Sequence, residues 1–165
     1  MFGGLLVALL GIWGGLIPFV GPYFHYAFTP DKAWTYTTGR LYLEILPAAG
    51  ALLGGLIMMA ARHRHVALFG SLLAIASGAW FALGNVFAPL WTVANPAGVP
   101  AAASTLHRIF EQIGFFSGLG VVIVLIAAVV AGRITAVPSV PLADREAVVP
   151  LTREPVDETE AFETR

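Results

Sequence analysis

The sequence contains no cysteine. Disulfide bonds, thiolate metal ligands and dithiol redox chemistry are therefore all excluded. Charged residues are also scarce, at 12% of the chain with a net charge of -1, whereas they make up about one quarter of an ordinary soluble domain. Because phosphate binding needs a dense surface of Lys and Arg, this composition excludes a nucleic-acid partner.

Common catalytic and cofactor motifs are missing as well. The sequence has no HExxH, GxSxG, P-loop or GxGxxG pattern. No Lys lies inside an apolar run, which excludes a retinal-type Schiff base. The histidines lie too close to the ends of the runs to supply the axial ligands of a membrane haem. We therefore expect no cofactor, no metal site and no catalytic residue.

What the sequence has in excess is apolar surface. Hydrophobic residues make up 58% of the chain, and its mean hydropathy is +0.80. A helix needs roughly 20 apolar residues to cross the hydrocarbon layer, and four such runs occur, at residues 2–20, 41–61, 66–88 and 109–131. Because the runs lack the alternation of barrel strands, we predict an all-α fold, a four-transmembrane-helix bundle over residues 1–131.

Basic residues near the helix ends predict an orientation. One side of the membrane would carry Arg62, Arg64, Arg133 and Arg145, and the other would carry Lys32, Arg40 and Arg108. If Arg40 and Arg108 pair with carboxylates, the bias places both termini in the cytoplasm. The start of the chain lacks a basic segment and a cleavage site, so we expect the first run to be retained. An aromatic belt at the outer interface would comprise Tyr23, Phe24, Tyr26, Trp34, Tyr36 and Trp91.

The chain also matches itself at an offset of 67 residues. GGLLVALLGIWGGLIPFVGPYF from Gly3 aligns with GSLLAIASGAWFALGNVFAPLW from Gly70, and the same offset aligns Glu44 with Glu111 without a gap. Gly, Leu and Ala are common in membrane helices and match by chance, but Trp, Pro and Glu are rarer. We interpret the match as a tandem duplication of a helical hairpin. Two such hairpins would be parallel repeats related by a pseudo-twofold axis along the membrane normal.

Small residues recur four positions apart, which places each pair on one helix face and lets helix backbones approach closely. The pairs are Gly11 and Gly15, Gly50 and Gly54, Ala74 and Gly78, and Gly114 and Gly118. We expect them to pack the four helices together, with a homo-oligomer formed through an exposed face as the alternative. Pro18 and Pro47 each remove a helical hydrogen bond and are expected to bend their helices.

Two glutamates near the helix starts form the candidate site for an ion, a proton or a partner. Glu44 follows Arg40 by four positions, and Glu111 follows His107 by four and Arg108 by three, so helical geometry brings these side chains together. In the simplest interpretation each Glu is a helix-start anion that pairs with its own base and reaches water by snorkelling. The alternatives are a paired acidic site for a proton, cation or amine, and a contact with lipid headgroups.

Residues 132–165 have a different composition, rich in Pro and acidic residues and poor in large apolar ones. We predict a disordered cytoplasmic tail that solubilises the chain. The alternative takes VDETEAFETR as a docking or phosphorylation segment, with Thr159 and Thr164 as the acceptors.

The stretches TTGRLYLEILPAAGALLGGLIMM and SGAWFALGNVFAPLW resemble small four-helix membrane proteins of actinobacteria. The shared features are a Gly-Arg entry to the second helix, a Leu-Pro followed by Gly-rich turns, and Gly-x-Trp-Phe in the third helix. The resemblance covers the membrane part and implies a fold without a chemistry.

From these observations and the resemblance we predict a non-catalytic accessory or scaffold subunit in the bacterial plasma membrane. Its partners would be membrane lipid, other membrane subunits or a further copy of itself, and a cytoplasmic partner of the tail. The first alternative is a small transporter or proton-coupled carrier that uses Glu44 and Glu111. A membrane enzyme built on the same glutamates is the third possibility.

Overall fold

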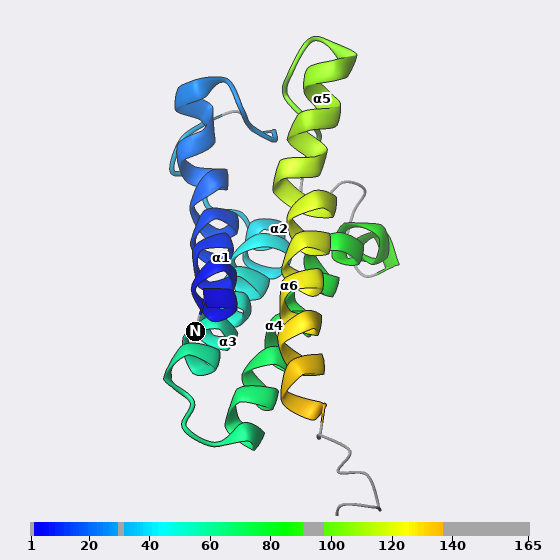
Figure 1. Ribbon diagram of the computed structural model, residues 1–165. Helices are drawn as coiled ribbons and strands as arrows, with labels where there is room; N and C mark the ends of the chain where they lie inside the picture. Colours follow the sequence, from blue (N-terminus) through cyan, green and yellow to red (C-terminus); the bar gives the residue numbers. More distant parts are fainter. Residues whose placement is uncertain (1, 30–31, 91–97, 137–165) are drawn as a thin grey trace, which may run out of the picture.

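The computed structural model describes residues 2–29, 32–90 and 98–136. These residues form four long helical segments, two of which are interrupted by a π-helical turn (Figure 1). The segments are α1 (Phe2–Val20) with the 3-10 turn η1 (Gly21–Phe24); α2 (Thr38–Arg40), η2 (Leu41–Ile45) and α3 (Leu46–Ala60); α4 (Arg64–Phe87) with η3 (Ala88–Leu90); and α5 (Thr105–Gln112), η4 (Ile113–Ser117) and α6 (Gly118–Thr135).

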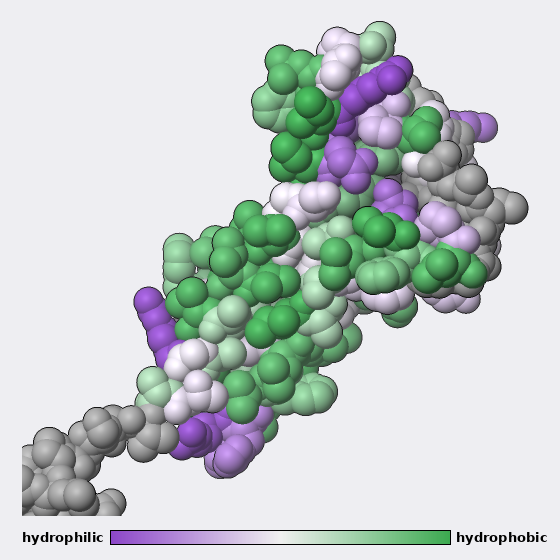
Figure 2. All heavy atoms as spheres, turned by 90° about the vertical axis from the view of Figure 1, so that its right-hand side faces the viewer, coloured by the Kyte–Doolittle hydropathy of each residue, from purple (hydrophilic) through white to green (hydrophobic). Residues whose placement is uncertain are grey.

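Each of the four segments is long and apolar enough to cross a membrane, which confirms the four predicted apolar helices. Figure 2 shows a band of hydrophobic side chains on the face in view, with hydrophilic side chains gathered toward the two ends. One end carries the described parts of the loops between α1 and α2 and between η3 and α5, and we call it the loop end. The opposite end carries the start of α1, the turn between α3 and α4 and the end of α6, and we call it the terminal end.

The fourth segment is longer than the predicted run of residues 109–131. It begins at Thr105 because the Ser104 hydroxyl accepts a hydrogen bond from the His107 N–H at 3.3 Å, and it ends at Thr135. Residues 132–135 are therefore helical and do not belong to the predicted tail. Residues 137–165, with Arg145, Thr159 and Thr164, lie outside the described residues.

The helices are arranged in a ring in which α1 packs on α3, α3 on α4 and α4 on α6, while α1 and α6 make a smaller contact. Glycines set the three close contacts. A Cβ added to Gly11 would lie 2.6 Å from the Leu52 nitrogen of α3, and one on Gly54 would lie 2.7 Å from the Gly70 oxygen of α4. A Cβ on Gly78 would lie 2.8 Å from the Gly120 oxygen of α6.

The other predicted packing glycines have different neighbours. A Cβ on Gly15 or Gly50 would meet a side chain of the next helix, Ala48 or Ser77, and one on Gly118 would meet Ile113 of its own segment. A Cβ on Gly114 would overlap the Tyr26 hydroxyl, so this glycine makes room for a loop side chain.

Substitution of Gly11 by Ala tests the close approach of α1 and α3. The new methyl group would press on the Leu52 nitrogen and on the Ala48 oxygen, and backbone atoms cannot rotate away as a side chain can. We expect Gly11→Ala to lower the free energy of unfolding in detergent by about 1–3 kcal/mol. Gly132→Ala is the matched control, since a Cβ there meets nothing within 4 Å. Equal stability of the two variants would contradict the prediction, because it would show that α1 and α3 can make room for the methyl group without loss of stability.

Pro47 explains the π-helical turn in the second segment. Its ring nitrogen carries no hydrogen, and in a regular helix its ring would clash with the carbonyl of Leu43. The chain accommodates it with one wider turn, in which the Leu46 N–H donates to the oxygen of Leu41, five residues back. A second wide turn occurs in the fourth segment, where the Gly118 N–H donates to the oxygen of Ile113.

Similar features of the second and fourth segments lie 72 residues apart, whereas the predicted repeat has an offset of 67. The π-helical turns begin at Leu41 and Ile113, which are 72 residues apart. Gly11 and Gly78 are 67 apart, yet Gly11 packs near Ala48 whereas Gly78 packs near Gly120, which is 72 residues further on. The gapless alignment therefore fails in the second helix of the hairpins.

The two glutamates consequently do not occupy corresponding positions. At an offset of 72, Glu44 corresponds to the buried Phe116 and Glu111 to Gly39. Glu111 lies five residues closer to the loop end than the position that matches Glu44, a distance of about 7.5 Å along a helix. The expected pair of carboxylates at equal depth is not what the structure shows.

Candidate functional site at the loop end

Two loops far apart in the sequence pair with each other at the loop end. The Thr29 N–H donates to the Val99 oxygen at 2.9 Å, and the Ala101 N–H donates to the Ala27 oxygen at 2.9 Å, on either side of an antiparallel bridge between Phe28 and Pro100. We call residues 26–29 and 99–102 the cap. Because one loop comes from each hairpin, the cap joins the two hairpins across the loop end.

Phe28 anchors the cap to the bundle. Its side chain is buried, and its ring lies 4.9 Å from that of Phe115 and 5.2 Å, edge to face, from that of Phe116. Tilted and edge-to-face pairs at these distances are favourable beyond the apolar area that they bury. The cap is therefore part of the hydrophobic core.

Arg40 is the buried cation of the site, with 1% of its surface exposed. Its Nη1 donates to the oxygens of Pro18 at 3.0 Å and Thr35 at 2.8 Å, and its Nη2 donates to the Phe28 oxygen at 3.3 Å. The Thr37 hydroxyl fixes the start of the helix by accepting from the Arg40 N–H at 3.1 Å. One guanidinium thus ties together the end of α1, the loop before α2 and the cap.

The bond to Pro18 follows directly from the sequence. In a helix the oxygen of residue 18 accepts from the N–H of residue 22, but residue 22 is Pro and has no N–H. A buried carbonyl without a donor is costly. The Arg40 guanidinium supplies the missing donor, and the planar fork of Arg serves several carbonyls at once.

Glu44 lies next to Arg40 but not at the water interface. Only 1% of its surface is exposed, and its Oε2 lies 4.0 Å from the Arg40 Nε. Neither carboxylate oxygen has a hydrogen-bond partner in the described part of the chain. The predicted ion pair with Arg40 is therefore confirmed, while the prediction that Glu44 snorkels to water is wrong.

Glu111 is completely buried and is bonded to backbone groups of the cap. Its Oε1 accepts from the Ala27 N–H and its Oε2 from the Ala102 N–H, each at 3.2 Å. The predicted pairing of Glu111 with Arg108 or His107 is not formed. Arg108 Nε instead donates to the Ala102 oxygen at 2.6 Å, so Glu111 and Arg108 bind the two backbone groups of the same residue.

Tyr26 completes the attachment of the cap to α5. Its hydroxyl donates to the Phe110 oxygen at 2.7 Å, and its ring lies 6.3 Å from that of His107. Burial raises the pKa of Tyr26 above the ordinary value of 10, and the nearby Glu111 charge raises it further. The hydroxyl therefore remains a hydrogen-bond donor at physiological pH.

Within the described residues, the buried charged side chains Arg40, Glu44 and Glu111 all lie at the loop end. The other buried polar side chains are Ser71 and Ser77, which donate to the oxygens of Ala67 and Leu73 in their own helix. No group of three His, Asp or Glu side chains in this part of the chain is arranged to hold a metal ion. The charged side chains of the site therefore hold the backbone of the two cap loops in place through hydrogen bonds.

No protein-family model, curated protein or solved structure matches this chain. The resemblance to small actinobacterial membrane proteins therefore stays a prediction. What the chain does has to be argued from the cap and the bundle.

Proposed function

We propose that this protein is a multi-pass plasma-membrane protein that acts as a non-catalytic accessory or scaffold subunit. The use of the buried charges supports this proposal. Arg40 and Glu111 bond to main-chain groups of the cap, with partners in both hairpins. Such an arrangement stabilises a fixed surface, whereas a reaction site would leave polar groups free for a substrate.

Exposed aromatic side chains lie on the loop end in the first hairpin and support a role in binding. Between 61% and 67% of the surface of each is exposed, and they are Tyr23, Phe24, Trp34 and Tyr36. Trp34 has a left-handed backbone with φ of 57°, which is rare for a bulky residue, and its ring stacks on Phe19 at 5.8 Å. Trp and Tyr suit both a membrane interface and a protein interface. Trp91, predicted as part of the same belt, lies outside the described residues.

The proposal places both termini in the cytoplasm and treats the bundle as two tandem hairpins. Arg62, Arg64 and Arg133 lie at the terminal end. At the loop end Arg40 is buried and paired with Glu44, which leaves Lys32 and Arg108, so the positive charge favours an inward terminal end by three to two. The matching contacts of α1 with α3 and of α4 with α6 support the duplication, with five residues more in the second hairpin.

A proton-coupled carrier is the second candidate function, and it rests on Glu44 alone. A buried carboxylate without hydrogen bonds is unusual, and ionisable groups inside membrane segments often belong to proton paths. Glu111 does not share this role, because both of its oxygens accept from backbone amides.

Glu44→Gln separates the two candidates. We expect an accessory subunit to migrate with a partner protein on native gels of mildly solubilised source membranes, and the Gln variant to migrate in the same way. The double variant Trp34→Ala/Tyr36→Ala should lose the complex, with Leu72→Ala, an exposed residue of α4, as the control. A chain that migrates alone, and whose proteoliposomes show a pH-dependent flux that Glu44→Gln abolishes, would favour the carrier.

A further inference from the structure

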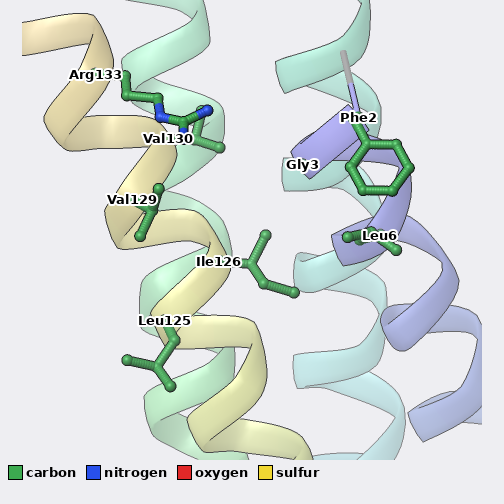
Figure 3. Close-up of a pocket in the computed structure, with 8 residues that line it drawn as sticks. All are labelled: Phe2, Gly3, Leu6, Leu125, Ile126, Val129, Val130 and Arg133. Atoms are coloured by element: carbon green, nitrogen blue, oxygen red, sulfur yellow. The ribbon is translucent and has the colours of Figure 1, made fainter.

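The seam between α1 and α6 contains an open groove at the terminal end of the bundle (Figure 3). It has a volume of about 520 Å³, within the range of ligand sites. Gly3 of α1 and Val130 and Ile126 of α6 form the floor of the groove, where the two helices are in contact. A Cβ on Gly3 would lie 2.6 Å from the Val130 side chain and 3.7 Å from that of Ile126. The seam between α3 and α4 carries a second, smaller groove of about 370 Å³, but no charged side chain lines it.

The walls of the groove are large, flexible apolar side chains. Phe2 and Leu6 rise on the α1 side, and Leu125 and Val129 on the α6 side. Phe2, Leu125 and Val129 are 74%, 60% and 53% exposed, so the groove is open to its surroundings. A packed transmembrane helix prefers a floor of small residues, as in the contacts of Gly11, Gly54 and Gly78, and this floor offers Gly3 between branched side chains. An acyl chain needs no such fit.

Arg133 adds a charge at one end of the groove. It lies in the last turn of α6, and Figure 3 shows its guanidinium directed toward the gap between the two helices. A membrane protein places such a residue at the depth of the lipid headgroups, where guanidinium binds phosphate through two parallel hydrogen bonds. The groove thus offers an apolar channel for a chain and a cation for the phosphate that the chain carries.

We propose that the groove between α1 and α6 is a binding site for one membrane phospholipid, with an acyl chain along Gly3, Ile126 and Val130 and the phosphate on Arg133. Burial of the CH₂ groups of an acyl chain is favourable relative to water, but the bilayer already supplies most of that term. Selectivity over bulk lipid therefore comes from the phosphate contact, and anionic lipids should bind best.

Native mass spectrometry of the purified full chain in mild detergent tests the proposal. The probes are dioleoyl phosphatidylglycerol, dioleoyl phosphatidylcholine and inorganic phosphate. We expect one phosphatidylglycerol per chain to survive delipidation, weaker retention of phosphatidylcholine, and no retention of phosphate alone. Arg133→Gln should weaken phosphatidylglycerol binding by about fivefold to tenfold. Arg64→Gln, at the same end of the bundle but outside the groove, should not.

A second pair of variants tests the place of the acyl chain. Val129→Trp fills the groove and should abolish the retained lipid, whereas Leu72→Trp, at a residue 54% exposed on α4, should leave it in place. Thermal midpoints of the variants confirm that each is folded. Equal losses for Arg133→Gln and Arg64→Gln would overturn the proposal in favour of diffuse charge at this end. Loss of a dimer, and not of lipid, in Val129→Trp would overturn it in favour of a second copy.

Discussion

Substitution of Arg40 by Met is expected to lower the free energy of unfolding by about 3–5 kcal/mol. The change removes the donor for three carbonyl groups, including the Pro18 oxygen that has no helical donor, and leaves the Glu44 carboxylate buried without its counter-charge. Thermal or denaturant unfolding in detergent, followed by tryptophan fluorescence, measures the loss.

Two further variants show which interaction dominates at Arg40. Glu44→Gln should change stability far less than Arg40→Met, because the guanidinium keeps its three carbonyl partners. Arg40→Met/Glu44→Leu should recover part of the loss, since no charge is then buried alone. If Glu44→Gln proves as damaging as Arg40→Met, the ion pair and not the carbonyl network holds the loop end together.

Substitution of Glu111 by Ala is expected to destabilise the protein by about 3 kcal/mol, because two buried amides of the cap lose a charged acceptor. Glu111→Gln should recover only part of this loss. Its side-chain oxygen can accept from Ala27 or from Ala102, but its NH₂ group then faces the other N–H.

Amide hydrogen exchange of the cap provides a local measurement for the same residue. In the wild type the Ala27 and Ala102 amides should be protected, and in Glu111→Ala both should exchange faster. Leu106→Ala is the matched control, since Leu106 lies on the same helix, is 65% exposed and is not bonded to Glu111. Protection that survives in Glu111→Ala would mean that the cap is held by its strand pairing and by Phe28.

The helices could be predicted from the sequence, and their detailed register could not. Long apolar runs fix helices because lipid offers no partner for an open backbone. The predicted repeat has a gapless offset of 67, and this offset could not show that the two wide turns begin at Leu41 and Ile113, 72 residues apart. Because of this difference of five residues, Glu111 lies nearer the loop end than the gapless alignment predicts.

The hydrogen-bond partners of the buried charged residues were harder to predict from the sequence than the helices. Spacing rules describe neighbours on one helix, and they correctly joined Arg40 to Glu44. Glu111 bonds to Ala27, which is 84 residues away, through a backbone group that carries no side-chain signal. The sequence did contain one clue: Pro22 leaves the carbonyl of Pro18 without a donor, which requires a donor from elsewhere but does not name Arg40.

Small-residue spacing identified some of the close contacts and missed others. A Cβ added to Gly55 would lie 2.5 Å from the Ala8 nitrogen, and one on Gly120 would lie 2.7 Å from the Ala82 nitrogen, about as close as the 2.6 Å for Gly11. Neither belongs to the pairs chosen by spacing along one chain. Whether a glycine makes a close contact depends on which helix faces it. The spacing of small residues along one helix does not contain that information.

The strand pairing of residues 27–29 with 99–101 also decides where the bundle can move. It clamps one hairpin to the other at a single extremity, so neither hairpin can slide along its neighbour there without breaking main-chain bonds. At the opposite end the short turn between α3 and α4 also joins the hairpins, so an opening of the bundle would begin at the ends of α1 and α6 that no loop connects. The widest excursion would fall between the first and last helices, where opening breaks the fewest contacts.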